Sequence, residues 1–114
     1  MIAKTLLDYL GTALAVPVVM EAPEQLSGYV LIDQTGSSRT NHIITTTFAI
    51  QSYGDTLYNA MLLNEDVKNA MVGFADLDAI TRVELQTDYN FTNTATKQYR
   101  WQAVYLITHY QEDR

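Results

Sequence analysis

Histidine and serine are the side chains in this 114-residue sequence that could carry acid–base or nucleophilic chemistry. The two histidines, His42 and His109, are far apart, and neither has a second ligand at the spacing that a zinc or iron site requires. Ser37 and Ser38 lie close to His42, but a nucleophilic serine needs a fixed base and an orienting acid, which a polar loop does not supply. We therefore predict that both histidines are ordinary surface or core residues and that no catalytic residue is present.

The only paired carboxylates that suggest a metal site are Asp76 and Asp78, which alternate across Leu77. A calcium loop also needs a glycine at its turn and a distal bidentate acid, and neither follows at the required spacing. The chain has no cysteine, which excludes disulfides, thiolate metal sites and a cysteine nucleophile. We predict a turn between a helix and a strand at this position, no metal, no cofactor and no enzyme activity.

The charge balance argues against a nucleic-acid-binding protein. The net charge is −6, and the 7 basic residues are scattered from Lys4 to Arg114 without a cluster that could neutralise phosphates. The longest apolar stretch, Ala13–Met20, contains Pro17 and is far shorter than the roughly 20 residues that span a bilayer. The first residues also lack the pattern of a signal peptide. We expect a cytosolic chain that neither binds DNA tightly nor enters a membrane.

Two amphipathic helices are predicted. The first, Ile2–Leu14, has apolar residues at helical spacing and polar residues on the other side. The second follows Gly54, with Asp55 expected to accept hydrogen bonds from the free amides of its first turn, and ends near Gly73 or Phe74. The apolar residues that recur at helical spacing in this second helix, and are expected to face the core, are Leu57, Ala60, Met61, Val67, Ala70, Met71 and Phe74.

Alternating or continuous apolar residues predict the strands between and after these helices. Pro17 favours a sheet edge for the first strand, and the last strand is apolar on both faces, which predicts a central position. The element order is α-β-β-β-α-β-β, an α+β fold with a mostly antiparallel sheet of four to five strands and two helices, in a single domain over residues 1–114. The expected strands are Val16–Met20, Tyr29–Gln34, His42–Tyr53, Ile80–Gln86 and Tyr99–Tyr110.

Two polar segments, Gln34–Asn41 and Thr87–Lys97, are predicted to be long loops. Long ordered loops in compact domains are usually functional, and aromatic residues inside such a loop are typical of partner contacts. The residues that we expect to contact neighbouring subunits or partners are Ser37, Ser38, Arg39, Tyr89, Phe91 and Lys97.

A series of segments along nearly the whole chain carries a resemblance to a known family. The most telling is a strand that passes directly into an alanine-containing helix through Ser52-Tyr53-Gly54-Asp55. The segments are Thr5–Leu10, Val16–Glu21, Pro23-Glu24, Phe48–Tyr53, Leu57–Met71 and Gln98–Tyr110. In their order and spacing the chain resembles the tail terminator proteins of long-tailed, non-contractile phages and the related minor tail proteins of prophages.

The resemblance implies a structural protein of the virion, located in the tail and neck and assembled in the host cytoplasm. Each chain would be one subunit of a ring, commonly hexameric, that caps the tail tube and joins it to the head. Its partners would be other copies of itself, the major tail protein and the head connector or stopper protein, with DNA passing through the ring without tight binding. Two alternatives stay open: a head-completion or connector protein of the same neck, and a small enzyme or ligand-binding domain, which needs a concave pocket with convergent polar groups.

Overall fold

The computed structural model describes residues 2–24 and 28–110. The strands form one sheet in the order β1-β2-β3-β5-β4, in which β1 and β2 run parallel and the other neighbours run antiparallel. The predicted α+β class and element order are confirmed. Along the chain the elements are α1 (Ile2–Ala13), β1 (Val18–Val19), β2 (Tyr29–Thr40), β3 (Ile43–Gly54), α2 (Leu57–Phe74), β4 (Ile80–Asn90) and β5 (Tyr99–Tyr110).

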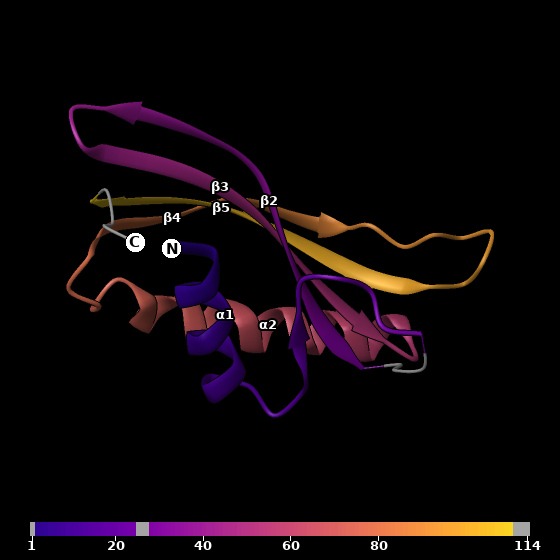
Figure 1. Cartoon of the computed structure of the whole chain (residues 1–114). Coiled ribbons are helices and arrows are strands. Elements are labelled where there is room, and N and C mark those ends of the chain that lie inside the picture. Colours follow the sequence, from indigo (N-terminus) through magenta and orange to yellow (C-terminus); the bar gives the residue numbers. More distant parts are fainter. Residues whose placement is uncertain (1, 25–27, 111–114) are drawn as a thin grey trace.

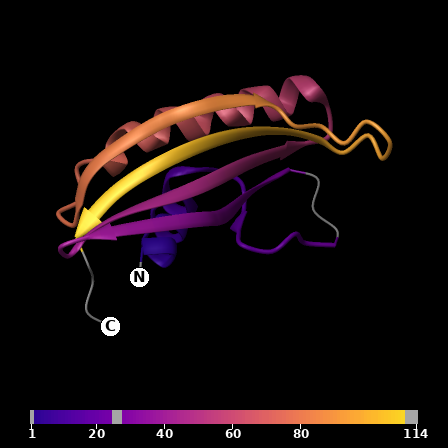
Figure 2. The ribbon, with the colours of Figure 1, turned by 90° about the horizontal axis from the view of Figure 1, so that it is seen from above.

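Both helices cover the same face of the sheet (Figure 1), and the view from above shows the strands lying over them (Figure 2). Helix α2 packs on β3 and β5, and α1 packs on α2 and β1. We call the other side of the sheet, over which no described helix lies, the open face. The largest fully buried apolar side chains between the sheet and the helices are Leu6, Leu10, Ile32, Phe48, Ile50, Met71, Phe74 and Ile107.

The strand positions agree with two expectations from the sequence. Strand β5, which is apolar on both faces, lies between β3 and β4 and so has a partner along each edge. The first strand is shorter than expected, but it lies at the edge of the sheet as Pro17 predicted. Proline has no amide hydrogen to donate, and its carbonyl oxygen accepts a 2.9 Å hydrogen bond from the amide of Val30.

The start of α2 is capped by Thr56, and the prediction of Asp55 as the cap was wrong. The Thr56 hydroxyl accepts a 3.0 Å hydrogen bond from the amide of Asn59. Asp55 lies one residue earlier, and its carboxylate accepts instead from the Asn59 side-chain amide at 2.7 Å. Threonine in extended backbone conformation supplies the acceptor that the first turn needs, so the carboxylate is not required there.

The predicted loop Gln34–Asn41 is a strand, and this prediction was wrong. β2 continues to Thr40 and pairs with β3, so that only Asn41 and His42 form the turn. The end of β2 is exposed throughout, and an exposed strand shows no apolar alternation from which its pairing could be recognised. Threonine also favours strands, and Thr45–Thr47 supply the pairing partners.

The turn of this β2–β3 hairpin holds two non-glycine residues in the left-handed region, Asn41 at φ 50° and His42 at φ 71°. Asparagine tolerates this conformation, but a residue like histidine pays about 1 kcal/mol for it, and Asn-Gly is the preferred two-residue turn. We expect His42→Gly to raise the free energy of unfolding by about 0.5–1 kcal/mol, measured by urea denaturation. Unchanged or lowered stability would show that His42 makes compensating contacts within its own chain.

The second predicted loop, Thr87–Lys97, is shorter in the structure than expected. β4 runs to Asn90, so Tyr89 belongs to a strand, and the connection to β5 begins at Phe91 and includes Lys97. Asn93 and Gln98 also form an isolated antiparallel β-bridge, which shortens the unpaired part of this connection.

Helix α2 buries Ala60, Val67, Met71 and Phe74, as its apolar spacing predicted, but the prediction was wrong for two residues of its first turns. Leu57 and Met61 are each 39% exposed, whereas Asn64, which is polar, is buried in their place. The Asn64 amide donates to the Asp88 carboxylate of β4 at 3.5 Å, and the same carboxylate accepts from the Trp101 indole at 3.0 Å. Asp88 therefore fixes α2 against the sheet through partners that are distant in sequence.

Candidate functional site

The six residues predicted to contact partners do not form one site. Ser37, Ser38 and Arg39 lie on β2 near the hairpin turn and pair with the first residues of β3. Tyr89 pairs with Gln102, towards the other end of the sheet. Tyr89 and Phe91 are brought together, with ring centroids 5.8 Å apart in a T-shaped arrangement, and Lys97 lies further along the same connection. The sheet thus has two separate exposed ends.

The end of the open face near Tyr89 carries a chain of polar side chains. Successive residues of a strand point to opposite faces, and because Phe48 and Ile50 face the helices, Gln51 and Tyr53 reach the face at which Gln51 bonds to Gln102. Gln51, Tyr53 and Gln102 are buried although no described helix covers them, whereas Arg100 is half-buried and Tyr89 is exposed. The residues of this chain, which we call the open-face network, are Gln51, Tyr53, Tyr89, Arg100 and Gln102.

The hydrogen bonds of the open-face network all run in one direction. The Arg100 guanidinium donates to the Tyr53 hydroxyl at 3.1 Å, and that hydroxyl donates to the Gln51 side-chain oxygen at 2.7 Å. The Gln51 amide donates to Gln102 at 2.8 Å, and the Gln102 amide donates to the Tyr89 hydroxyl at 2.5 Å. The three middle groups, Tyr53, Gln51 and Gln102, each accept one of these hydrogen bonds and donate the next, so the chain couples β3, β5 and β4 across the face. In such a chain each hydrogen bond polarises and strengthens the next.

Aromatic rings border this network at both sides. Tyr29 of β2 stacks on Tyr53 with centroids 4.4 Å apart, and burial together with the neighbouring Tyr53 raises the pKa of the Tyr29 hydroxyl. Arg100 lies over the Phe91 ring at 4.4 Å and donates to the Phe91 carbonyl oxygen at 2.6 Å. Phe91 is therefore held by a cation–π contact and a backbone hydrogen bond, which makes it a fixed part of the surface.

Removing Gln102 tests whether the open-face network holds the sheet together. Gln102→Leu leaves the Gln51 amide and the Tyr89 hydroxyl without their partner, so we expect the free energy of unfolding to fall by about 1–3 kcal/mol. Gln86→Leu, at an exposed position of β4, is the matched control and should change stability by less than about 0.5 kcal/mol. Equal effects of the two substitutions in urea denaturation would contradict a stabilising network.

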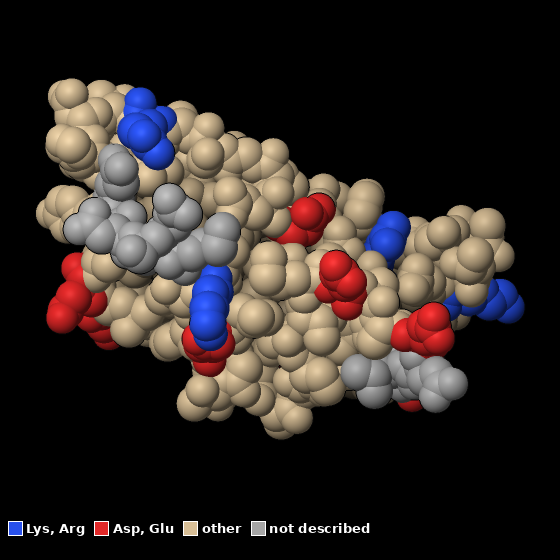
Figure 3. Space-filling view, in the orientation of Figure 1, with Lys and Arg blue, Asp and Glu red and all other residues tan. Residues whose placement is uncertain are grey.

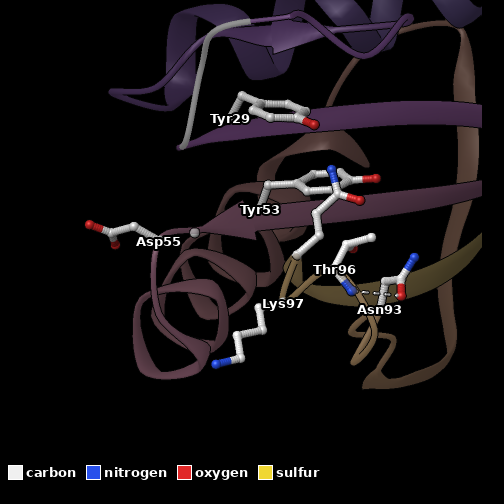
Figure 4. A pocket seen from close by; sticks show the side chains of 8 residues that line it. Tyr29, Tyr53, Asp55, Asn93, Thr96 and Lys97 are labelled. Atoms are coloured by element: carbon white, nitrogen blue, oxygen red, sulfur yellow. Dashed lines mark hydrogen bonds between the residues drawn. The ribbon is translucent and has the colours of Figure 1, made fainter.

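A pocket of about 540 Å³ lies beside the two stacked tyrosines. Figure 4 shows Asp55 and Lys97 pointing away from the tyrosine rings, while Asn93 and Thr96 bond to each other across the loop. A site for a small charged ligand requires polar or charged groups that converge on a common point. The charged groups at this pocket do not converge in this way. Its full lining consists of Tyr29, Tyr53, Gly54, Asp55, Asn93, Thr96, Lys97 and Gln98.

The surface that sequence reasoning missed lies on the first turns of α2. Leu57 and Met61 are each 39% exposed, Tyr58 is 63% exposed and Leu62 is 45% exposed. They form two apolar pairs four residues apart, which places them side by side on the helix surface. This spacing was visible in the sequence, but Leu57 and Met61 had been assigned to the core. We call these four residues the α2 patch.

The described residues offer little support for other kinds of site. No group of three or more His, Asp or Glu in residues 2–24 and 28–110 could hold a metal ion. None of the helices described is both long and apolar enough to cross a membrane. On the face seen in Figure 3, basic and acidic residues are interspersed, without a continuous basic area.

Comparison with known proteins gives no assignment. No protein-family model matches the sequence, and a search of curated proteins returned no significant match. The function is therefore inferred from the residues and surfaces of the chain itself.

Proposed function

We propose that this chain is a structural subunit of a ring, commonly of six subunits, that caps the tail tube of a long-tailed, non-contractile phage or prophage particle and joins it to the head. The ring would belong to the tail and neck of the virion and assemble in the host cytoplasm. Its partners are other copies of the chain, the major tail protein and the head connector or stopper protein.

The observation that carries this proposal is the α2 patch. Four large apolar side chains lie together on a part of α2 that the other described elements leave exposed, and such clusters mark protein contacts rather than ligand sites. A protein that works through assembly needs a surface of this kind, whereas a small enzyme needs converging polar groups. Together with the family resemblance of its segments, the patch favours a subunit of an assembly.

The charge distribution fits a ring through which DNA passes. The net charge is −6, and basic residues are separated from one another on the visible face (Figure 3). A duplex that moves through an acidic channel is repelled by its wall and does not adhere to it. In this proposal DNA passes through the ring and is not bound tightly by it.

Native mass measurement and negative-stain images test this proposal together. The purified chain, mixed with the major tail protein, is expected to give a ring-sized mass and tubes that each end in a ring. A chain that stays monomeric in the mixture, with tubes bare at both ends, would contradict the proposal. The alternative assignment to the head connector predicts that rings form but do not bind tubes.

A further inference from the structure

The sheet, as far as the structure describes it, has a long free edge on each side. β4 is the last strand and has only β5 beside it. On the other side β1 pairs only with Val30 and Leu31, so the remainder of β2, Asp33–Thr40, has no outer neighbour among the described residues. A free edge presents a row of unpaired amide and carbonyl groups, which is a template for pairing with another chain. Each copy therefore offers two edges to further strands.

The two free edges match in direction and in extent. β2, β3, β5 and β4 each run antiparallel to their neighbour, so β2 and β4 run in opposite directions. A second copy placed beside the first in the same orientation therefore brings its β2 antiparallel to β4 of the first. Through their partners in β3 and β5, Arg39 lies on the same cross-strand row as Ile80. Asp33 likewise lies on the row of Thr87, so the two edges cover the same rows.

The charges at one end of these rows are complementary. Arg39 is exposed and has no ion-pair partner among the described residues. Asp76 and Asp78, in the connection from α2 to β4, are also exposed and unpaired within the described part of the chain. Arg39 shares its row with Ile80, a core residue, so its side chain points to the helix side of the sheet. The connection from α2 reaches the sheet from that same side and at that same end.

Within one chain these charged groups lie on opposite edges of the sheet. β3 and β5 separate β2 from β4, so three strand spacings of about 4.8 Å, roughly 14 Å, lie between the row positions of Arg39 and Ile80. Where a second copy continues the sheet, one spacing of about 4.8 Å separates the same positions. A long arginine side chain can bridge that shorter separation. Continuation of the sheet therefore gives Arg39 the acidic partner that it lacks in its own chain.

We propose that the free edge of β2 in one copy, Asp33–Arg39, pairs antiparallel with Ile80–Thr87 of β4 in the next copy, and that repetition of this contact builds the ring. Arg39 then faces Asp78, with Asp76 beside it. Main-chain hydrogen bonds hold an added strand of this kind. Because the two edges differ, the contact is head-to-tail, which is the type that closes rings. This inference rests on the proposed ring function and names the surfaces through which its copies join.

Cysteine cross-linking tests this pairing, since the chain has no cysteine of its own. Ser38 and Arg82 share a cross-strand row on the open face. Two single variants of the full chain, Ser38→Cys and Arg82→Cys, are mixed in the presence of the major tail protein and mildly oxidised. A disulfide needs Cα atoms within about 7 Å, which excludes a bond inside one chain across roughly 14 Å. The proposal predicts a mixed disulfide above its statistical share.

The matched control replaces Arg82→Cys with Asn90→Cys, an exposed position on the same strand towards the other end of the sheet, and should give no excess of mixed disulfide. A mixed disulfide at only the statistical share, while wild-type rings still form on tail tubes, would overturn this contact and leave the ring function standing. An excess of the Arg82→Cys homodimer would overturn it too, because two β4 edges would then pair with each other. Wild-type chain that forms no ring at all would overturn both the contact and the ring function.

Charge reversal gives a second readout that misfolding cannot imitate. Arg39→Asp in the Ser38→Cys chain, or Asp78→Arg in the Arg82→Cys chain, is expected to lower the yield of mixed disulfide about tenfold, because like charges then face each other. The two reversals together should restore the yield. A combination that cross-links as poorly as either single reversal would contradict the proposed pairing of these rows.

Discussion

Gly54→Ala is expected to lower the free energy of unfolding by about 2–3 kcal/mol, or the melting temperature by roughly 10 °C, the largest stability effect of any single substitution considered. A Cβ atom at this position would lie 2.6 Å from the backbone nitrogen of Ala60 and 3.0 Å from the carbonyl carbon of Asn59. Both are backbone atoms, so the strand and the helix must move apart to accept it. The φ angle of Gly54 is not positive, so alanine could adopt its backbone conformation. The expected loss of stability therefore comes from the steric clash of the added Cβ atom.

The control is Gly11→Ala, on the exposed side of α1, where an added Cβ meets no atom within 4 Å. Alanine is a better helix former, so this variant should gain about 0.5–1 kcal/mol. Thermal and urea unfolding of both variants measure the difference. If Gly54→Ala unfolds like the wild type, the close contact between β3 and α2 is not a constraint on the fold.

Tyr58→Asp is expected to abolish ring assembly while leaving the subunit folded. An unpaired carboxylate taken out of water at an interface costs at least about 3 kcal/mol, which weakens association by more than roughly 100-fold. In the free subunit the side chain is exposed, and a carboxylate in the first turn of a helix interacts favourably with the free amides there. Subunit stability should therefore change by less than about 0.5 kcal/mol.

Val72→Asp is the matched control, because Val72 is 77% exposed on the same helix but lies outside the α2 patch. Native mass measurement and images of tail tubes are expected to show rings with Val72→Asp and none with Tyr58→Asp. Equal assembly of both variants would mean that the α2 patch faces solvent in the ring.

The elements with strong periodicity could be predicted from the sequence. The two helices and the central position of β5 follow from apolar spacing that is local to each segment. The end of β2 could not be predicted, because its residues are polar and exposed and its strand conformation comes from pairing with β3. Burial of Asn64 likewise depends on Asp88, which is distant in sequence and meets the helix only in the folded chain.

The exposed surface features could be predicted only in part, for a similar reason. The aromatic pair Tyr89 and Phe91 was identified from its polar surroundings, but its connection to Gln51 and Arg100 depends on strand register. Leu57 and Met61 of the α2 patch were wrongly predicted to face the core, because apolar spacing on a helix does not reveal which part of the apolar stripe the sheet covers. Arg39 was expected in a loop and instead lies on β2, because the strand conformation there depends on pairing with β3.

The most direct test of the proposed ring function is an electron micrograph of the phage or prophage particles to which we propose this chain belongs, with Tyr58→Asp introduced. A terminator ring limits tube growth, so the account predicts filled heads without tails beside tails of abnormal length, because an uncapped tube continues to grow. Normal-length, capped tails beside heads that have lost their DNA would contradict it and assign the chain to the head connector instead.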